Sequence, residues 1–166
     1  MEGGTLNRVE QLTAYISEML RCTRCGFCQA ACPVYDALRT ESSVARGKVQ
    51  LLLAVYVGRL EPTERLIGHL YRCLDCRLCQ QTCPGGVRTD EIFAGAKRWM
   101  AENGLLPAPL QELRRRVVES HNIAGEENAN RLLWRENLET PAGASECAEV
   151  VFFTGCVSSL YPMVYG

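Results

Sequence analysis

The sequence has no large net charge, no long apolar run and no glycine-rich nucleotide loop. A net charge of −1 over 166 residues argues against nucleic acid as the main partner. The longest apolar run, residues 51–57, is far too short to span a bilayer, and no targeting segment opens the chain. Neither a G-x-G-x-x-G nor a P-loop pattern occurs, and no catalytic nucleophile or general base stands out. We therefore expect no direct membrane span and no catalytic residue, and we expect any flavin or nicotinamide on another subunit.

Cysteine, by contrast, is abundant. Ten cysteines occur without an export signal, which predicts a reducing cytoplasm where thiolates stay available for metal, with any membrane association coming through a partner. Eight of them form two runs of the pattern C-x2-C-x2-C-x3-C-P, at residues 22–33 and 73–84, with a constant offset of 51 residues. This run binds a [4Fe–4S] cubane in two-cluster bacterial ferredoxins.

The spacing also predicts which cysteines share a cluster. Three closely spaced cysteines can hold three irons on one loop, while the fourth leaves on a departing segment and reaches the other cluster. We therefore expect two [4Fe–4S] clusters with crossed ligands, which would couple folding to cluster assembly. One cluster is assigned to Cys22, Cys25, Cys28 and Cys83, and the other to Cys73, Cys76, Cys79 and Cys32.

Two other interpretations of the cysteines are weaker. Zinc modules usually present two C-x2-C pairs separated by a dozen or more residues, whereas each run here holds four cysteines without a spacer. A zinc-stabilised interaction module therefore stays a remote alternative. A disulfide framework does not suit a chain of this length with 47% hydrophobic residues and no signal peptide.

The rest of the sequence favours an all-α fold around the cysteine loops, because apolar residues recur there at helical spacing. Ser42 or Ser43 is expected to cap one helix, and Pro62 to occupy the first position of the next. The expected helices cover residues 5–21, 44–58, 62–72, 89–103, 109–120 and 129–138.

Basic residues near the first run and late in the chain have two interpretations each. Positive charge beside a cluster would raise its reduction potential. For Arg46 this role and a solvated surface position both remain open, whereas for Lys48 the surface position is favoured. The three arginines at 114–116 are expected on a solvated helix face, with contact to an acidic partner as the alternative.

The C-terminal segment changes character. Residues 148–154 are β-branched and aromatic, which predicts a strand, and Gly155-Cys156 follows at once. In an α/β domain, a buried strand that ends this way presents a ligand at its carboxyl end. Because a lone strand cannot form a sheet, we expect either a fragment of a longer protein or a strand that joins another chain.

These motifs resemble a known family. Cys-Gly-Phe-Cys-x3-Cys-Pro-Val-Tyr, then Arg-Gly-Lys-x2-Leu-Leu, then the second cysteine run, is similar to the α-helical ferredoxin module of the heterodisulfide reductase family. Related modules open the iron–sulfur subunits of glycolate oxidase, lactate oxidation systems and anaerobic glycerol-3-phosphate dehydrogenase. The segment Val-Val-Phe-Phe-Thr-Gly-Cys156 resembles the opening of that family's cysteine-rich CCG domain, which makes Cys156 a possible further ligand.

The resemblance implies a domain order and a function. Residues 1–106 would form a two-[4Fe–4S] ferredoxin domain, 107–147 a helical extension and linker, and 148–166 the start of an incomplete CCG domain. The implied function is an electron relay to or from a CCG-type site. The missing C-terminal part or another chain would supply that site. The alternative is the electron-accepting subunit of a flavin-dependent glycolate, lactate or glycerol-3-phosphate dehydrogenase. Cys147 matches no motif and is expected to be a spare buried thiol.

Overall fold

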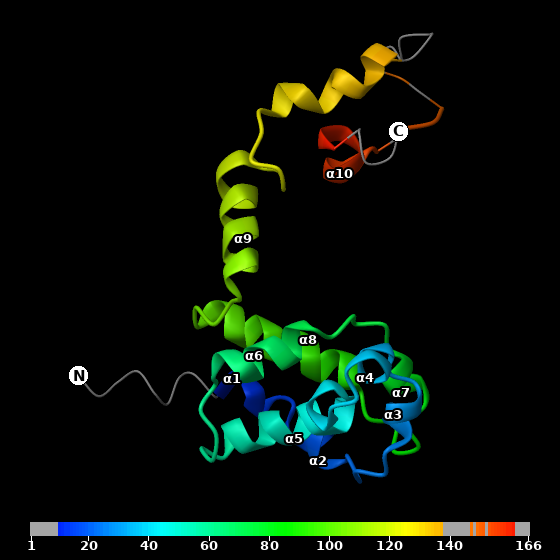
Figure 1. Ribbon diagram of the computed structural model, residues 1–166, viewed down its shortest axis with the longest axis vertical. Helices are drawn as coiled ribbons and strands as arrows, with labels where there is room; N and C mark the ends of the chain where they lie inside the picture. The colour runs from blue at the N-terminus through cyan, green and yellow to red at the C-terminus, as the bar shows by residue number, and fades with distance from the viewer. Residues whose placement is uncertain (1–9, 138–146, 148, 152, 162–166) are drawn as a thin grey trace, which may run out of the picture. The chain divides into compact units, whose positions relative to one another are not determined.

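The structure is a computed structural model that describes residues 10–137, 147, 149–151 and 153–161 (Figure 1). The chain divides into two compact units, residues 1–107 and 108–166. The elements of the first unit are α1 (Glu10–Thr13), α2 (Ile16–Leu20), α3 (Phe27–Ala30), α4 (Pro33–Leu38), the 3-10 helix η2 (Glu41–Ser43), α5 (Ala45–Tyr56), α6 (Glu64–Tyr71), α7 (Leu78–Gln81) and α8 (Thr89–Glu102). Those of the second unit are α9 (Ala108–Ser120), the 3-10 helix η3 (Asn128–Asn137) and α10 (Gly155–Leu160). The predicted all-α fold is confirmed for the described residues.

The core of the first unit lies among α5, α6 and α8 (Figure 1). Leu52, Leu70 and Ile92, one from each helix, are completely buried. Burying one such side chain stabilises a fold by roughly 1.5–3 kcal/mol. Five cysteines of the two runs pack against this cluster, so the core fixes the positions of both cysteine loops; they are Cys22, Cys28, Cys73, Cys79 and Cys83.

The N-terminal segment is broken rather than continuous. The N–H of Tyr15 donates to the carbonyl of Leu12, three residues back, and this tight turn separates α1 from α2. The Tyr15 ring packs on α8 at Gly95, where a Cβ atom would lie 2.2 Å from the ring. The single helix predicted over residues 5–21 is therefore wrong for residues 10–21, and residues 5–9 lie outside the described part.

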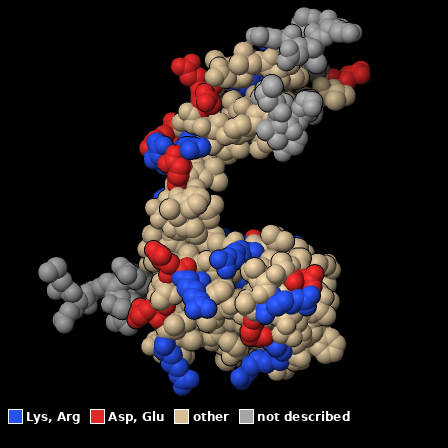
Figure 2. Space-filling view, in the orientation of Figure 1, with Lys and Arg blue, Asp and Glu red and all other residues tan. Residues whose placement is uncertain are grey.

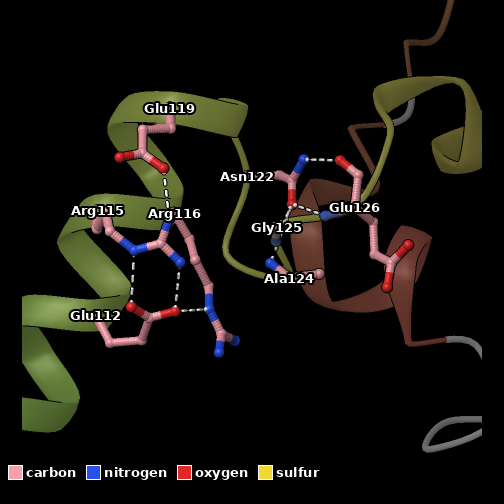
Figure 3. A network of polar contacts seen from close by, with 8 residues as sticks. All are labelled: Glu112, Arg115, Arg116, Glu119, Asn122, Ala124, Gly125 and Glu126. Carbon is pink, nitrogen blue, oxygen red and sulfur yellow. Dashed lines mark hydrogen bonds and ion pairs between the residues drawn. The ribbon is translucent and has the colours of Figure 1, made fainter.

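The second unit shows where two of the three adjacent arginines point. Arg115 donates to the Glu112 carboxylate from Nε at 2.9 Å and from Nη2 at 2.8 Å, and Arg116 donates to it from Nε at 2.8 Å (Figure 3). Glu119 also pairs with Arg115. These pairs lie along one exposed helix, which favours the interpretation of a solvated face.

The turn after α9 is organised by Asn122. Its side-chain carbonyl accepts from the N–H of Ala124 at 3.0 Å and of Gly125 at 2.8 Å, and its amide donates to the Glu126 carbonyl at 2.8 Å (Figure 3). Only 1% of Asn122 is exposed. The buried side chain thus pairs with backbone groups of the turn and holds its conformation.

The strand predicted for residues 148–154 is not confirmed. Residues 148 and 152 lie outside the described part, and the described residues between 149 and 154 are irregular. Gly155 and Cys156 open helix α10 instead of following a strand. The physical reason is that a strand needs a neighbour to receive its backbone hydrogen bonds.

The described surface carries both signs of charge. On the face drawn in Figure 2, acidic and basic side chains are interspersed over the first unit. Within the described residues, no helix combines the length and the apolar character that crossing a membrane requires.

Candidate metal centres

The structure brings five cysteines from both runs around one cavity. The cavity holds about 420 Å³ of space, part of it open to solvent. Three come from the first loop, Cys22, Cys25 and Cys28, and two from the second run, Cys79 and Cys83. All of them except Cys79 are the residues that the sequence assigns to one cluster. We call this cavity site A.

A second cavity is lined by one cysteine of the first run and three of the second. It holds about 470 Å³ of space, again partly open, and is lined by Cys32, Cys73, Cys76 and Cys79. We call it site B. Each cavity thus offers the all-thiolate donor set that a [4Fe–4S] cluster requires, so the residues present fit that group. The eight cysteines are free thiols and form no disulfide with one another.

The two sites share a wall. Ala45, Cys79 and Thr89 line both cavities. The Thr89 side chain is 4% exposed, and its hydroxyl oxygen lies 3.1 Å from the sulfur of Cys79. Because the same side chains belong to both linings, groups bound at the two sites would be near neighbours.

The repeat extends to the backbone of the cysteine loops. Arg24 and Asp75, related by the offset of 51, have φ angles of 60° and 52°. Gly26 and Arg77, the next related pair, have φ angles of 93° and 62°. The left-handed conformation suits glycine but costs other residues roughly 1–2 kcal/mol each. The same strained turn is therefore kept in both copies, and it curls the three cysteines of each loop around a cavity.

Exposure distinguishes the cysteines from one another. Cys25 of site A and Cys76 of site B, again a pair related by the offset, are exposed. The other six cysteines of the runs are half-buried. Each site therefore reaches the surface at its middle loop cysteine.

Burial also affects the acidity of the thiols. It raises the pKa of Cys28, an effect opposed by the backbone N–H and the charge of Arg46. Burial raises the pKa of Cys79 as well, and here the Thr89 hydroxyl opposes the shift. In the free protein these two thiols therefore hold their protons, and metal must displace them on binding.

Two basic residues of helix α5 lie near different sites. Arg46 lines site A and is paired with Glu41, with Nη2 2.9 Å from Oε2. This pair lowers the pKa of Glu41. Lys48 lines site B and is 2% exposed, so the predicted surface position for Lys48 is wrong.

Gly47 explains how both side chains reach their sites. A Cβ atom at this position would lie 2.1 Å from the Glu41 carbonyl oxygen, so only glycine lets α5 approach η2 this closely. The approach brings the Lys48 ammonium to 2.6 Å from the Ser43 carbonyl oxygen. Sequence periodicity gave no sign of this contact.

The two remaining cysteines lie in the second unit. Cys156 is half-buried in α10, with Nη2 of Arg131 at 3.4 Å from its sulfur. Cys147 is exposed, which corrects the expectation of a buried thiol. A role for Cys156 as a further ligand stays a prediction.

The segment that contains both cysteine runs is similar to a known protein family. The family model described as "4Fe-4S dicluster domain" matches residues 18–87, the segment that contains both runs. Residues 18–87 of this chain are therefore similar to the [4Fe–4S] dicluster domains of that family. The iron–sulfur cofactor predicted from the runs is confirmed at this level.

Several curated relatives have overlapping sequences. The glycolate oxidase iron–sulfur subunit of Escherichia coli is 39% identical over 56% of this chain and 23% of its own length. The probable glycolate oxidase iron–sulfur subunit of Bacillus subtilis is 38% identical over 52% of this chain and 20% of its own length. The dihydromethanophenazine:CoB–CoM heterodisulfide reductase of Methanosarcina mazei has one subunit that is 26% identical over 90% of this chain and 40% of its own length.

The chain thus spans between a fifth and two fifths of these relatives. The predicted relationship to heterodisulfide reductase and glycolate oxidase iron–sulfur proteins is confirmed, as is the coarse prediction of an iron–sulfur electron-transfer protein.

Proposed function

We propose that the domain binds two [4Fe–4S] clusters and relays electrons between them. The observation that supports this proposal is that each cavity is lined by the three loop cysteines of one run and the last cysteine of the other, with Cys79 also bordering site A. When bound, such clusters supply one-electron transfer. Cys22, Cys25, Cys28 and Cys83 hold the cluster of site A, and Cys32, Cys73, Cys76 and Cys79 hold that of site B.

The protein's own part is to position, shield and connect the two clusters. Six of the eight thiols are half-buried, and five of these pack against the core beneath the loops, which limits the access of water. The shared wall of Ala45, Cys79 and Thr89 keeps the path between the sites short. The exposed Cys25 and Cys76 give each cluster its own approach from the surface, as a relay between a donor and an acceptor requires.

The partners follow from the relatives and remain part of the proposal. The heterodisulfide reductase relative aligns with 90% of the chain, including residues beyond the ferredoxin domain, which supports a relay to or from a CCG-type site. Residues 148–166 would then begin that domain, after a linker at 107–147. The higher identity to glycolate oxidase proteins supports the alternative, an electron-accepting subunit beside a flavin-containing one. A cytoplasmic location stays a prediction from the free cysteines.

Metal and sulfide analysis of anaerobically purified protein tests the proposal first. Two clusters predict about eight iron and eight acid-labile sulfide per chain, with a coupled [4Fe–4S] EPR signal after dithionite reduction. About two zinc and no sulfide would contradict it and support the zinc module instead. Among the described residues, no three cysteine, histidine or acidic side chains converge on a position for a single metal ion.

Paired alanine variants test the crossed ligands. Cys32→Ala with Cys73→Ala removes two ligands from site B alone, and about four iron should remain. Cys32→Ala with Cys22→Ala removes one ligand from each site, and both clusters should be lost or impaired. If ligands were not crossed, the first pair would damage both sites and the second pair only one. Cys147→Ala is the control, since this exposed cysteine lies outside both runs.

A further inference from the structure

Within the described part of the chain, a buried ammonium group lines site B and none lines site A. Lys48 lines site B with 2% of its surface exposed. Its Nζ donates to the Ser43 carbonyl at 2.6 Å and lies 5.8 Å from the centre of the Phe93 ring. Both contacts suit a cation, because a carbonyl oxygen and the face of an aromatic ring each present negative charge.

No carboxylate of the described residues forms an ion pair with Lys48. The other charged residues that line site B are Asp75, Arg77 and Asp90. Asp75 pairs with Lys97, and Arg77 pairs with Asp90 at 3.2 Å, so these charges are balanced close by. The ammonium of Lys48 is left as the uncompensated charge in the interior at site B.

Site A has basic residues too, but their charges are balanced or solvated. Arg46 pairs with Glu41, and Arg21 pairs with Glu18 at 3.2 Å. Arg24, the third basic residue of the lining, is exposed to solvent. Water and salt screen an exposed charge strongly and a buried one weakly. Among the described residues that line the two sites, Lys48 is therefore the buried cation without a carboxylate partner, whereas Arg46 acts on Cys28 of site A but is paired with Glu41.

We propose that Lys48 makes the cluster of site B the one with the higher reduction potential, and so directs electrons from site A to site B. The inference rests on the proposed two-cluster function. Reduction adds one negative charge to a cluster, and a buried cation beside it favours that added charge. The transfer moves one electron from the reduced cluster of site A to the oxidised cluster of site B, and no bond forms or breaks. The Thr89 hydroxyl at Cys79 acts in the same direction.

Redox titration followed by EPR tests this proposal in the cluster-loaded chain. Cys25→Ser and Cys76→Ser each alter the signal of one cluster and thereby assign the two potentials. In the native protein, the cluster whose signal Cys76→Ser alters should be reduced first. If the cluster whose signal Cys25→Ser alters is reduced first, the proposal is overturned. This part of the experiment needs no change at Lys48.

Variants of Lys48 test the cause. Lys48→Met and Lys48→Gln remove the charge while keeping a long side chain. Each should shift the redox equilibrium of the site B cluster about tenfold toward its oxidised form, which lowers its reduction potential by about 59 mV for a one-electron couple. Lys48→Arg keeps the charge and should keep the order of potentials. Arg24→Gln, which removes the exposed charge at site A, should move neither potential by more than a small fraction of that shift.

The failure of this inference can be told apart from a failure of the proposed function. Iron and sulfide near eight per chain, together with unchanged potentials in both neutral variants, would overturn the role of Lys48 and leave the two-cluster proposal standing. A wild-type chain without sulfide would overturn both. If neither Lys48→Met nor Lys48→Gln retains its clusters, the order of the two reduction potentials in the native chain decides whether the proposal stands.

Discussion

The hydroxyl of Thr89 lies 3.1 Å from the sulfur of Cys79, in the wall between the two sites. A hydroxyl that donates to a cluster thiolate stabilises the more negative, reduced state. Thr89→Val keeps the shape of the side chain and removes the donor. We expect both clusters to remain and the potential of site B to fall by roughly 20–60 mV, since such a hydrogen bond is worth about 0.5–1.5 kcal/mol.

The control for this change is Thr82→Val. The Thr82 hydroxyl donates to the Leu78 carbonyl at 3.0 Å and lies in the same loop region, and no hydrogen bond within the described residues joins it to a sulfur. An equal fall in potential in both variants would show that the hydroxyl at Cys79 has no special effect.

Glu18 ties α2 to the segment that follows the second loop. It is 6% exposed and accepts from the backbone N–H of Arg88 at 2.7 Å and from the Arg21 guanidinium at 3.2 Å. Replacing it by glutamine weakens these charge-assisted bonds, so Glu18→Gln should lower the free energy of unfolding by about 1–3 kcal/mol at pH 7. Urea unfolding of the anaerobic protein measures this, with the exposed Glu91→Gln as the control.

The same carboxylate makes stability depend on pH. The Arg88 N–H, with help from Arg21, lowers the pKa of Glu18 below its ordinary value of 4.5. Its contribution is therefore complete above about pH 4.5 and is lost as the pH falls from there through the pKa of the folded state. Unfolding free energies of wild type and Glu18→Gln should converge in that range. A difference that stays constant down to acid pH would contradict this role.

Gly95 and Tyr15 form the close contact between α8 and the N-terminal segment. A Cβ atom at Gly95 would lie 2.2 Å from Cε2 of the ring, so the ring must move away. Gly95→Ala should therefore destabilise the chain by about 1–3 kcal/mol, the usual cost of overpacking.

Gly68→Ala is the matched control for Gly95. Gly68 lies within helix α6, and an added Cβ atom there meets no atom within 4 Å. This change should stabilise the chain by about 0.4–1 kcal/mol, because alanine restricts the unfolded chain. Thermal unfolding of the two variants should therefore move in opposite directions. A stable Gly95→Ala protein would mean that Tyr15 does not pack there in solution.

The carboxylate of Glu112 should titrate at unusually low pH. Its hydrogen bonds with Arg115 and Arg116 lower its pKa to about 2. The pairing should therefore persist above pH 4.5 and be lost only as the pH falls through about 2. Carbon-13 NMR of the side-chain carboxyl measures the midpoint. Arg115→Gln should raise it, whereas Arg114→Gln changes an arginine outside the network of Figure 3 and serves as the control.

Local spacing allowed much of the site to be predicted. Cys32 and Cys83 each lie with the cysteines of the opposite loop. This grouping follows from the spacing in each run, because three closely spaced cysteines occupy one loop and the fourth leaves on a departing segment. A helix over residues 89–103 was also expected, and α8 covers Thr89–Glu102, but its N-cap is Arg88 and not Thr89 or Asp90 as the sequence indicates. The Thr89 hydroxyl lies at Cys79 instead, since the fold brings the loop alongside.

Features that depend on distant contacts could not be predicted. The burial of Lys48 requires Phe93, which lies on another helix, and the break at Tyr15 accompanies its contact with Gly95. Local capping also differed from expectation. Val44 rather than a serine precedes α5 because Ser42 and Ser43 form η2.

At the start of α6, Thr63 accepts from the Leu66 N–H, and Pro62 lies outside the helix. In the sequence, a threonine just before the helical pattern of apolar residues is typical of an N-cap and would have indicated this one.

The reciprocal lining of the two cavities has a consequence for ancestry. Half of this domain, on its own, would carry three ligands for one site and a single ligand for a site that it lacks. Two identical halves related by a twofold axis would complete each other, each lending its last cysteine to its twin. A gene fusion of such a symmetric pair would retain the exchange within one chain. After such a fusion the two copies would be free to diverge, as they differ at the related positions Gly26 and Arg77.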